Sequence, residues 1–520
     1  MVLVLVITAG AILGVSALSH LRTATPDYRE GLVSDERPLS LNPLVGATDI
    51  PVRDIGELLY RRLLRLDERA VPVGDLSSGY SVTQDGITYH LPLRPGQLWS
   101  DGHAISVADV LATVAWIQSP TFGDALTAAP WRGVHARADG DGVSFDLAGP
   151  RASFAALLTQ TPILPLGALP PPAIAALPST AAQAMATSGP YRVTESSTLS
   201  VTLFPNPHAA KAPLLNQVQI QLFGTFSDAA AAFRAGTVDG VLATNPVQRA
   251  ELLADGGSAH RVVSFRFVDL LFNERNPLLA DPAVRQAIAT GVNRSALVSG
   301  PLRGMGTAQV GAIPAGLAWV QPRAPVPAGD SAAAASALEA DGWTAGADGV
   351  RARAGTRLQL RLAVADVVPL PDQAVAVKAQ LAAIGIDAQV TSVSATTLRS
   401  LLVGGIGYDL AIADWDNGPD PDVSTFWRST ATPPAGFNVS GGGPDPFLDQ
   451  ALDRLATLVD PTARSAAAQA VTAQLADDLP AVFLDTPENA LVVRPGLSVL
   501  VPAVGTTGSR FDRIAEWRRG

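Results

Sequence analysis

Apolar and polar residues alternate along several short stretches of the chain, a spacing of two that is typical of strands with one buried face. Residues 358–365 and 387–393 alternate in this way on either side of an amphipathic segment, residues 373–385. A helix in that segment is expected to bury four apolar side chains, those of Val375, Val377, Leu381 and Ile384. A strand, a helix and a second strand in this order predict two parallel strands joined by a right-handed crossover. This part of the chain is therefore expected to form an α/β unit.

The same patterns predict further elements on both sides of this unit. They are a strand at 218–222, a helix and a strand within 226–241, an apolar strand at 270–273, a helix opening at 284–288, a helix at 331–343 and a last helix at 471–479. A second folded unit is expected to begin near Val262, and residues 481–517 are expected to return to the first unit as strands. A chain that crosses twice between two units can form a hinge.

Length and composition narrow the class of protein. A chain of 520 residues is expected to form two or three folded units, and 47% hydrophobic with 16% charged residues provides for large cores. The net charge of −10 argues against nucleic acid or an anionic membrane surface as a partner. The absence of cysteine excludes disulfides, thiol catalysis and cysteine-bound metals, and also a lipidated cysteine as an anchor.

The first residues indicate an exported protein. Residues 2–18 are an unbroken run of apolar and small residues, and Val15-Ser16-Ala17 offers a small-x-small cleavage site. No basic residue precedes the run, so residues 1–23 are interpreted as either a signal peptide or an uncleaved membrane anchor. A buried core helix is the alternative, but the polar stretch at 19–37 that follows is typical of a linker.

Residues 71–112 contain the most specific motif of the chain. Asp85-Gly86 predicts a two-residue hairpin, and a second tight turn is expected at Ser100-Asp101-Gly102. Ser106 is then expected to cap a helix with an apolar face. These turns and this cap, at this spacing, resemble the signature segment of bacterial extracellular solute-binding protein family 5, the receptors of peptide, dipeptide and nickel ABC importers.

The resemblance extends from about Leu39 to about Trp517 and implies a fold. Other matching segments are 39–43, 55–60, 187–193, 206–221, 235–239 and 340–343. The implied fold is α/β, two-lobed and periplasmic-binding-protein-like (the large class II type), with mixed sheets, a hinge, and an extra subdomain in the first lobe. Lobe I is expected to comprise residues 24–261 and 485–520, with the subdomain inserted at about 45–186, and lobe II residues 262–484.

An aromatic and acidic loop within residues 410–428 is the first candidate for a ligand site. Loops at the carboxyl ends of strands in α/β sheets commonly bind ligands. In the peptide receptors that the chain resembles, the matching loop presents an acidic residue to the amino group of the ligand, beside an aromatic wall. The candidates here are Trp415, Asp416, Asn417, Asp420 and Trp427.

Asp416 is the candidate for the amine contact, since an ammonium group has only donors to offer. The loop is one residue shorter than in the family, so the acidic position matches Asp416 with a gap and Gly418 without one. The alternative is a solvent-exposed turn that binds no ligand, because the residues of Asn-Gly-Pro-Asp-Pro strongly favour turns. A calcium loop is disfavoured, because Thr425 occupies the twelfth position counted from Asp414.

Three more residues complete the candidate ligand site. Thr48 and Asp49 lie in a segment that resembles the lining of the cleft from lobe I, and Asn273 ends an apolar strand. In dipeptide receptors an arginine follows the strand that matches 358–365, but residues 366–371 contain no basic residue. The ligand therefore lacks a carboxylate at that place, is longer, or is not a peptide; Arg323 and Arg428 are possible substitutes.

Enzyme chemistry finds little support. The histidines are scattered without metal-ligand spacing, and no nucleophile elbow or phosphate loop is present. The aspartates of residues 414–422 could imitate the carboxylate pair of a glycosidase, but turn or ligand contacts explain them better. Neither catalytic residues, a metal nor a cofactor is therefore expected.

These observations favour an exported, monomeric receptor of an ABC importer. It is expected to bind a peptide or a peptide-like solute between two closing lobes, and to deliver this solute to a membrane permease. The alternative is a cell-envelope regulator or scaffold that keeps the fold without transport. The shortened acidic loop and the missing arginine keep that alternative open.

Overall fold

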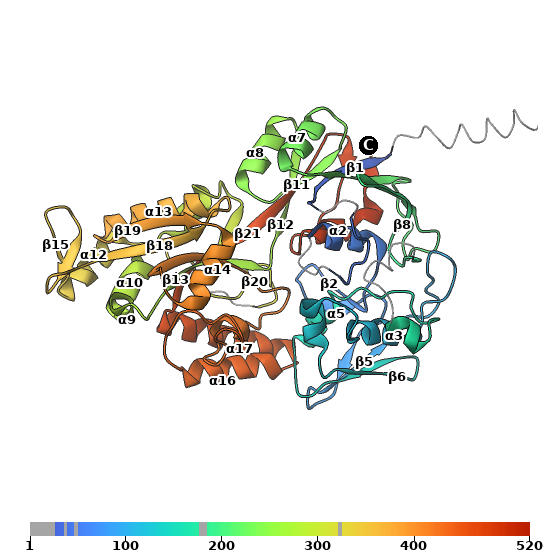
Figure 1. The fold of residues 1–520 in the computed structure, drawn as a ribbon, viewed down its shortest axis with the longest axis horizontal. Helices are drawn as coiled ribbons and strands as arrows, with labels where there is room; N and C mark the ends of the chain where they lie inside the picture. The colour runs from blue at the N-terminus through green and yellow to red at the C-terminus, as the bar shows by residue number, and fades with distance from the viewer. Residues whose placement is uncertain (1–25, 36–38, 46–49, 176–184, 321–324) are drawn as a thin grey trace, which may run out of the picture.

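The chain folds into two lobes that lie side by side and are joined along one edge (Figure 1). The computed structural model describes residues 26–35, 39–45, 50–175, 185–320 and 325–520. The predicted leader, residues 1–23, lies outside these ranges. Among the described residues, no helix combines the length and the apolar character that crossing a membrane requires.

One large mixed sheet runs through both lobes and holds twelve strands among the described residues. In spatial order they are β19 (Asp387–Val393), β18 (Gln359–Ala365), β20 (Leu410–Asp416), β13 (Arg266–Phe272), β21 (Ala481–Val493), β11 (Gly240–Ala243), β1 (Tyr28–Val33), β10 (Val218–Phe223), β9 (Ser200–Pro205) and β8 (Tyr191–Ser196), while β12 (Ser258–Val263) and β14 (Gly306–Ala308) also pair with β21. Strand β18 is parallel to β19 and β20, and β1 is parallel to β10 and β11.

Strand β21 connects the lobes. Up to Asp485 it pairs with β13, and from Glu488 onward it pairs with β12. The chain crosses a second time between β12 and β13, through Ser264 and Phe265. Both crossings lie side by side, which is the arrangement of a two-stranded hinge. The division of the chain into domains at these points remains our prediction.

Lobe II contains the predicted β-α-β unit. Strands β18 and β19 pair in parallel along their whole length, with α13 (Leu370–Ala383) between them in sequence. Val377, Leu381 and Ile384 are buried as predicted, but the prediction for Val375 is wrong, because its side chain is 62% exposed. Val375 lies two positions, about 200° of helix rotation, from Val377 and therefore faces away from the sheet.

Other helices of lobe II cover the two faces of this sheet. They are α10 (Pro282–Gly291), α11 (Arg294–Ser299), α12 (Ser331–Ala340), α14 (Ala395–Gly404), α16 (Pro446–Thr457) and α17 (Pro461–Asp478). The last predicted helix is thus longer than expected. It begins at Pro461, where Asp460 caps it by accepting a hydrogen bond from the Ala463 N–H, since proline fits the first helical position.

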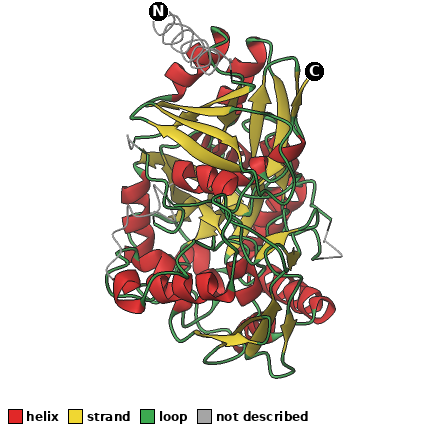
Figure 2. Cartoon of the chain, turned by 90° about the vertical axis from the view of Figure 1, so that its right-hand side faces the viewer, coloured by secondary structure: helices red, strands yellow, loops and turns green. Residues whose placement is uncertain are grey.

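The inserted part of lobe I has its own small sheet, seen at the bottom of Figure 2. Its strands are β4 (Ser81–Val82), β5 (Thr88–Pro92), β7 (Gly142–Asp146) and β6 (His135–Asp139), with α3 (Val107–Ile117) and α5 (Phe154–Leu158) against them. Ser106 precedes α3 as predicted, and its N–H and hydroxyl both donate to the Asp109 carboxylate at 2.9 Å. The expected two-residue hairpin is a four-residue loop, because the Thr83 N–H donates to the Thr88 carbonyl.

The chain end packs into lobe I mainly as turns rather than strands. After β21 only β22 (Leu497–Ser498) and β23 (Arg518–Arg519) pair, so the predicted run of strands is only partly present in the described residues. Arg510 is fully buried there and donates to Glu30 of β1 at 2.7 Å and to Asp54 of α2 (Ile50–Leu59) at 2.5 Å. This ion network links the C-terminal segment to β1 and α2 of lobe I.

Candidate functional site

The carboxyl ends of β18, β19 and β20 lie at one edge of the lobe II sheet. Parallel strands place the loops that follow them together, and such an edge is where α/β folds commonly bind ligands. Strand β13 runs antiparallel to β20, so its first residue, Arg266, lies opposite Asp416, the last residue of β20. The candidate loop that begins at Asp416 therefore lies at this edge, beside the region between the lobes (Figure 1).

Asp416 is the free carboxylate of this loop. Its side chain is exposed, and its Oδ1 accepts a hydrogen bond from the Gly418 N–H at 3.0 Å. Within the described ranges, no basic side chain forms an ion pair with it. Asn417 holds the loop in place, because its side-chain amide donates to the Asp420 carbonyl and its N–H donates to the Phe265 carbonyl. Arg266 lies directly opposite Asp416 on β13 and the two charges attract, but they form no ion pair, so Asp416 can still accept hydrogen bonds from a ligand cation.

Trp415 precedes Asp416 in β20, so its side chain points to the opposite face of the strand, toward Asp269 of β13. Its indole Nε1 donates to Asp269 Oδ2 at 3.1 Å. The ring lies 5.2 Å from that of Phe426 and 6.4 Å from that of Phe437, centroid to centroid. Asp269 is fully buried, and burial raises its pKa well above the ordinary value. The indole is therefore fixed by a buried hydrogen bond and two ring contacts.

Arg266 is a basic side chain at this edge that the sequence analysis missed. Its guanidinium forms a two-pronged ion pair with Asp414, with Nε 2.9 Å from Oδ1. This carboxylate is the main cause of a raised pKa of Arg266. No periodic pattern marks this residue, because residues 266–269 read Arg-Phe-Val-Asp without alternation, and its partner lies across the sheet.

Three predicted site residues are buried and engaged with the protein. Asp420 is 8% exposed and accepts two hydrogen bonds from Arg464, at 2.7 and 3.0 Å. Asn273 is 4% exposed and donates to two backbone carbonyls of the turn before β20. Trp427 is 4% exposed and packs edge-on against Phe483. Their roles as ligand contacts remain predictions. Of the predicted residues that the structure describes, Asp416 and Asn417 lie in the loop at the exposed edge, while Trp415 points to the other face of β20.

Of the remaining candidates, Arg428 is the one basic residue that the structure describes, and it is already paired. Thr48, Asp49 and Arg323 lie outside the described residues. Arg428 forms an ion pair with Asp453 at 2.6 Å. Residues 366–371, where dipeptide receptors carry an arginine, instead contain two exposed valines. The side chain of Val367 is 50% exposed and that of Val368 is 47% exposed.

Lobe I faces the loop from across the interface. The Gln160 amide nitrogen lies 3.4 Å from where a β-carbon on Gly418 would stand. The Ala152 N–H donates to the Ala456 carbonyl at 2.8 Å, which joins the lobes directly. A cavity of about 40 Å³ beside this contact is large enough to hold water. It is lined from lobe I by Tyr80 and Tyr89 and from lobe II by Trp319, Pro419 and Arg464.

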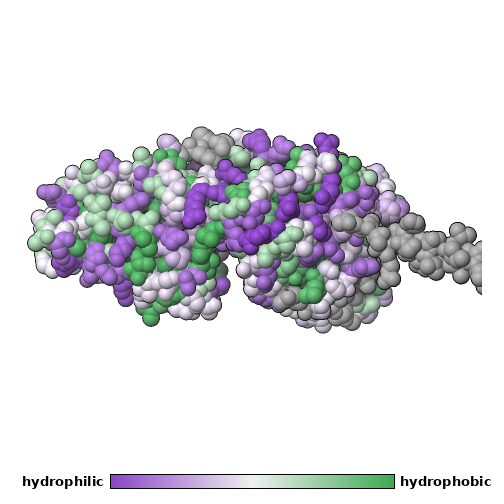
Figure 3. Space-filling view, turned by 90° about the horizontal axis from the view of Figure 1, so that it is seen from above, coloured by the Kyte–Doolittle hydropathy of each residue, from purple (hydrophilic) through white to green (hydrophobic). Residues whose placement is uncertain are grey.

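The lobes thus touch along one seam while a deep indentation separates them elsewhere, as the space-filling view in Figure 3 shows. The hinge strands lie along one border of this region and the contact between Ala152 and Ala456 along another. A ligand held between the lobes would contact both, and closing the hinge would complete its surroundings.

Comparisons with known proteins agree with this architecture. A family model described as bacterial extracellular solute-binding proteins, family 5 Middle, matches residues 71–437. Protein XP55 of Streptomyces lividans is 29% identical over 459 residues, which are 86% of this chain and 81% of XP55.

Solved structures share the fold of nearly the whole chain. The oligopeptide-binding protein AppA of Bacillus subtilis, in complex with a nonapeptide, has a TM-score of 0.68 and 22% identity, covering 95% of this chain and 100% of AppA. NikA of Brucella suis, in complex with Fe(III)-EDTA, has a TM-score of 0.78 and 19% identity, with coverage of 95% and 100%. The predicted two-lobed α/β fold of periplasmic binding proteins is confirmed. The family match spans more than half of the chain, which therefore belongs to the bacterial extracellular solute-binding proteins, family 5.

Proposed function

We propose that this protein is an exported receptor of an ABC importer that binds a peptide or a peptide-like solute between its lobes. The observation that carries the proposal is the exposed carboxylate of Asp416 at the end of β20, which forms no ion pair with a basic side chain in the described part of the chain. The loop that follows it lies at the edge of lobe II, where Gly418 approaches Gln160 of lobe I. Residues 1–23 would direct export, and the closed receptor would deliver its ligand to a membrane permease.

The chemistry of the site defines the ligand we expect. A carboxylate without an internal partner suits an ammonium group, such as the amino terminus of a peptide. The exposed side chains of Val367 and Val368 suit an apolar neighbour. Arg266 is already paired with Asp414, so it offers less to the far carboxylate of a short peptide. We therefore expect a ligand with a free amine and an apolar body, and a longer peptide rather than a dipeptide.

Native mass spectrometry of the protein purified gently from its own envelope tests this proposal. We expect a family of co-purified masses in the peptide range, which an Asp416→Asn variant loses. An Asp477→Asn variant is the matched control, because Asp477 is exposed and lies at the opposite end of α17 from Arg464. A single non-peptide mass, or peptides retained equally by both variants, would contradict the assignment of Asp416.

A non-transporting regulator or scaffold of the cell envelope is the second candidate. The observation that favours it is the lack of any basic residue in 366–371, where dipeptide receptors of this family hold an arginine. An empty cleft after purification, together with no thermal shift in the presence of peptide libraries, would support the regulator over the importer.

A further inference from the structure

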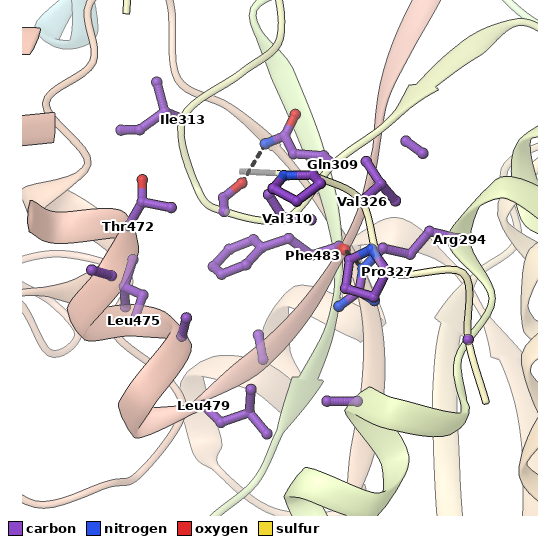
Figure 4. Close-up of a pocket in the computed structure, with 18 of the residues that line it drawn as sticks. Arg294, Gln309, Val310, Ile313, Val326, Pro327, Thr472, Leu475, Leu479 and Phe483 are labelled. Carbon is purple, nitrogen blue, oxygen red and sulfur yellow. Dashed lines mark hydrogen bonds between the residues drawn. The ribbon is translucent and has the colours of Figure 1, made fainter. Parts of the chain in front are cut away.

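A second cavity lies inside lobe II, away from the candidate cleft. Its volume is about 820 Å³, within the range of small-molecule sites. Helices α10, α11 and α17 and strands β14 and β21 contribute to its walls, together with parts of the segment between β14 and α12 (Figure 4). None of residues 414–418 lines it. The cavity and the candidate amine site are therefore separate features of the lobe.

The walls of this cavity are mainly apolar. The contacts that matter most for a hydrocarbon body come from Ile313, Val326, Pro327, Leu475, Leu479 and Phe483. Figure 4 shows the Phe483 ring reaching between α17 and the segment that carries Val310. Burying apolar surface against such walls is favourable by about 25 cal/mol per Å². An apolar ligand body would therefore be stabilised here.

Arg294 is the one cationic side chain among the described residues of this lining. Its side chain is 6% exposed, and its Nε donates to the Phe483 carbonyl at 2.7 Å. Its Nη1 is buried and has no hydrogen-bond partner in the described part of the chain, where no carboxylate forms an ion pair with it either. Burial lowers the pKa of Arg294 to about 10, so the group remains a cation at neutral pH. A buried cation without a counterion is costly, and an entering anion would relieve that cost.

Other polar groups that line the cavity are already engaged. Gln309 donates to the Gly311 carbonyl and accepts from Thr486. The Asp330 carboxylate caps α12 by accepting from the Ala333 N–H at 2.8 Å. The Arg294 guanidinium is thus the cationic group of the described lining, and Asp330 is the one carboxylate in it.

We propose that this cavity is a binding site for an apolar carboxylate, whose head group pairs with the guanidinium of Arg294 while its hydrocarbon body lies along Leu475, Leu479 and Phe483. A medium-chain fatty acid has this chemistry. The site is independent of the proposed peptide site, because the two share no residue. It does not require that the protein import its cleft ligand.

Calorimetric titration of the full chain with decanoate tests the proposal, with 1-decanol as the uncharged probe. We expect the wild type to bind one decanoate per chain. Arg294→Gln should bind decanoate about 10- to 100-fold more weakly, since a hydrogen bond to a charged group is lost. The affinity for 1-decanol should be the same in the wild type and in Arg294→Gln. The matched control is Lys378→Gln, which removes a positive charge from the exposed side of α13 and should bind decanoate like the wild type. Equal decanoate affinity in Arg294→Gln, or no binding to the wild type, would overturn the proposal.

Two further variants locate the site and keep the test decisive should Arg294→Gln fail to fold. Ala476 lines the cavity from α17, so the ring of Ala476→Phe would occupy part of it and should weaken decanoate binding. Unchanged affinity in that folded variant would refute this location. Asp416→Asn should leave decanoate binding unchanged. If this variant no longer bound decanoate, the ligand would lie in the cleft between the lobes, which would contradict a separate site.

Discussion

Asp485 is placed where β21 passes from one lobe to the other, and its ionisation should make stability depend on pH. Its side chain is fully buried, and Oδ2 accepts a hydrogen bond from Gln373 Nε2 at 2.6 Å. Oδ1 has no partner among the described residues. Burial is the main cause that raises the pKa of Asp485 from 3.8 to about 7. The nearby charges of Asp414 and Glu488 raise it as well, against Arg266.

The size of the effect follows from these values. The difference between a pKa of 3.8 and one of about 7 corresponds to about 4 kcal/mol in the free energy of unfolding. The folded protein holds this proton over a range in which the unfolded chain has released it. The stabilisation is therefore complete below about pH 4 and is lost as the pH rises through about 7. An Asp485→Asn variant keeps an acceptor for Gln373 but cannot ionise.

Thermal unfolding of the wild type and of Asp485→Asn between pH 4 and 8 measures this effect. We expect the melting temperature of the wild type to fall relative to that of the variant across this range, with the difference levelling off above pH 7. Other carboxyl groups with raised pKa values, such as Asp478, titrate in both proteins and cancel in the difference. Parallel curves would refute the argument that Asp485 holds a proton in the folded protein.

Two further substitutions test other parts of the account. Arg510→Ala should destabilise the protein by about 3–5 kcal/mol, because Glu30 and Asp54 would remain buried without their counterion. Urea unfolding measures this loss of stability. A loss below about 1 kcal/mol, which is within the range of a surface ion pair, would show that the network is not needed for stability. Gly418→Ala should cost about 1–2 kcal/mol, because the backbone at Gly418 has a φ of 69° that disfavours a β-carbon. The same variant should also weaken peptide binding, because the change in the loop would move Asp416. An unchanged peptide affinity in calorimetry would show that binding does not depend on the conformation of this loop.

Local patterns predicted the parts of the fold that depend on neighbouring residues. The alternation around 358–365 and 387–393 gave both strands and their parallel pairing, because the period of two and the intervening helix are local features. Ser106 was found for the same reason, since a cap and its partner lie three residues apart. The helix phase at Val375 was missed because an apolar residue outside the buried stripe looks the same in sequence.

Residues of the site depend on partners that sequence patterns do not reveal. Asp420 was predicted to face a ligand, but its partner Arg464 is 44 positions away in another element. Arg266 and Asp414 meet only because β13 and β20 are antiparallel neighbours. Likewise Arg294 looks like an ordinary helix residue, and only the packing of α17 and β21 shows that it is buried in a cavity.

Ligand-driven closure of the lobes is the central claim, and an interlobe distance tests it most directly. The chain has no cysteine, so fluorophores attach only to introduced ones. Leu126→Cys in α4 (Ala125–Ala128) of lobe I and Val375→Cys in lobe II are suitable, because these side chains are 68% and 62% exposed. On titration with apolar pentapeptides that have a free amino terminus, the account predicts a saturable rise in energy transfer, absent with N-acetylated peptides. Saturated peptide binding at an unchanged interlobe distance would contradict it.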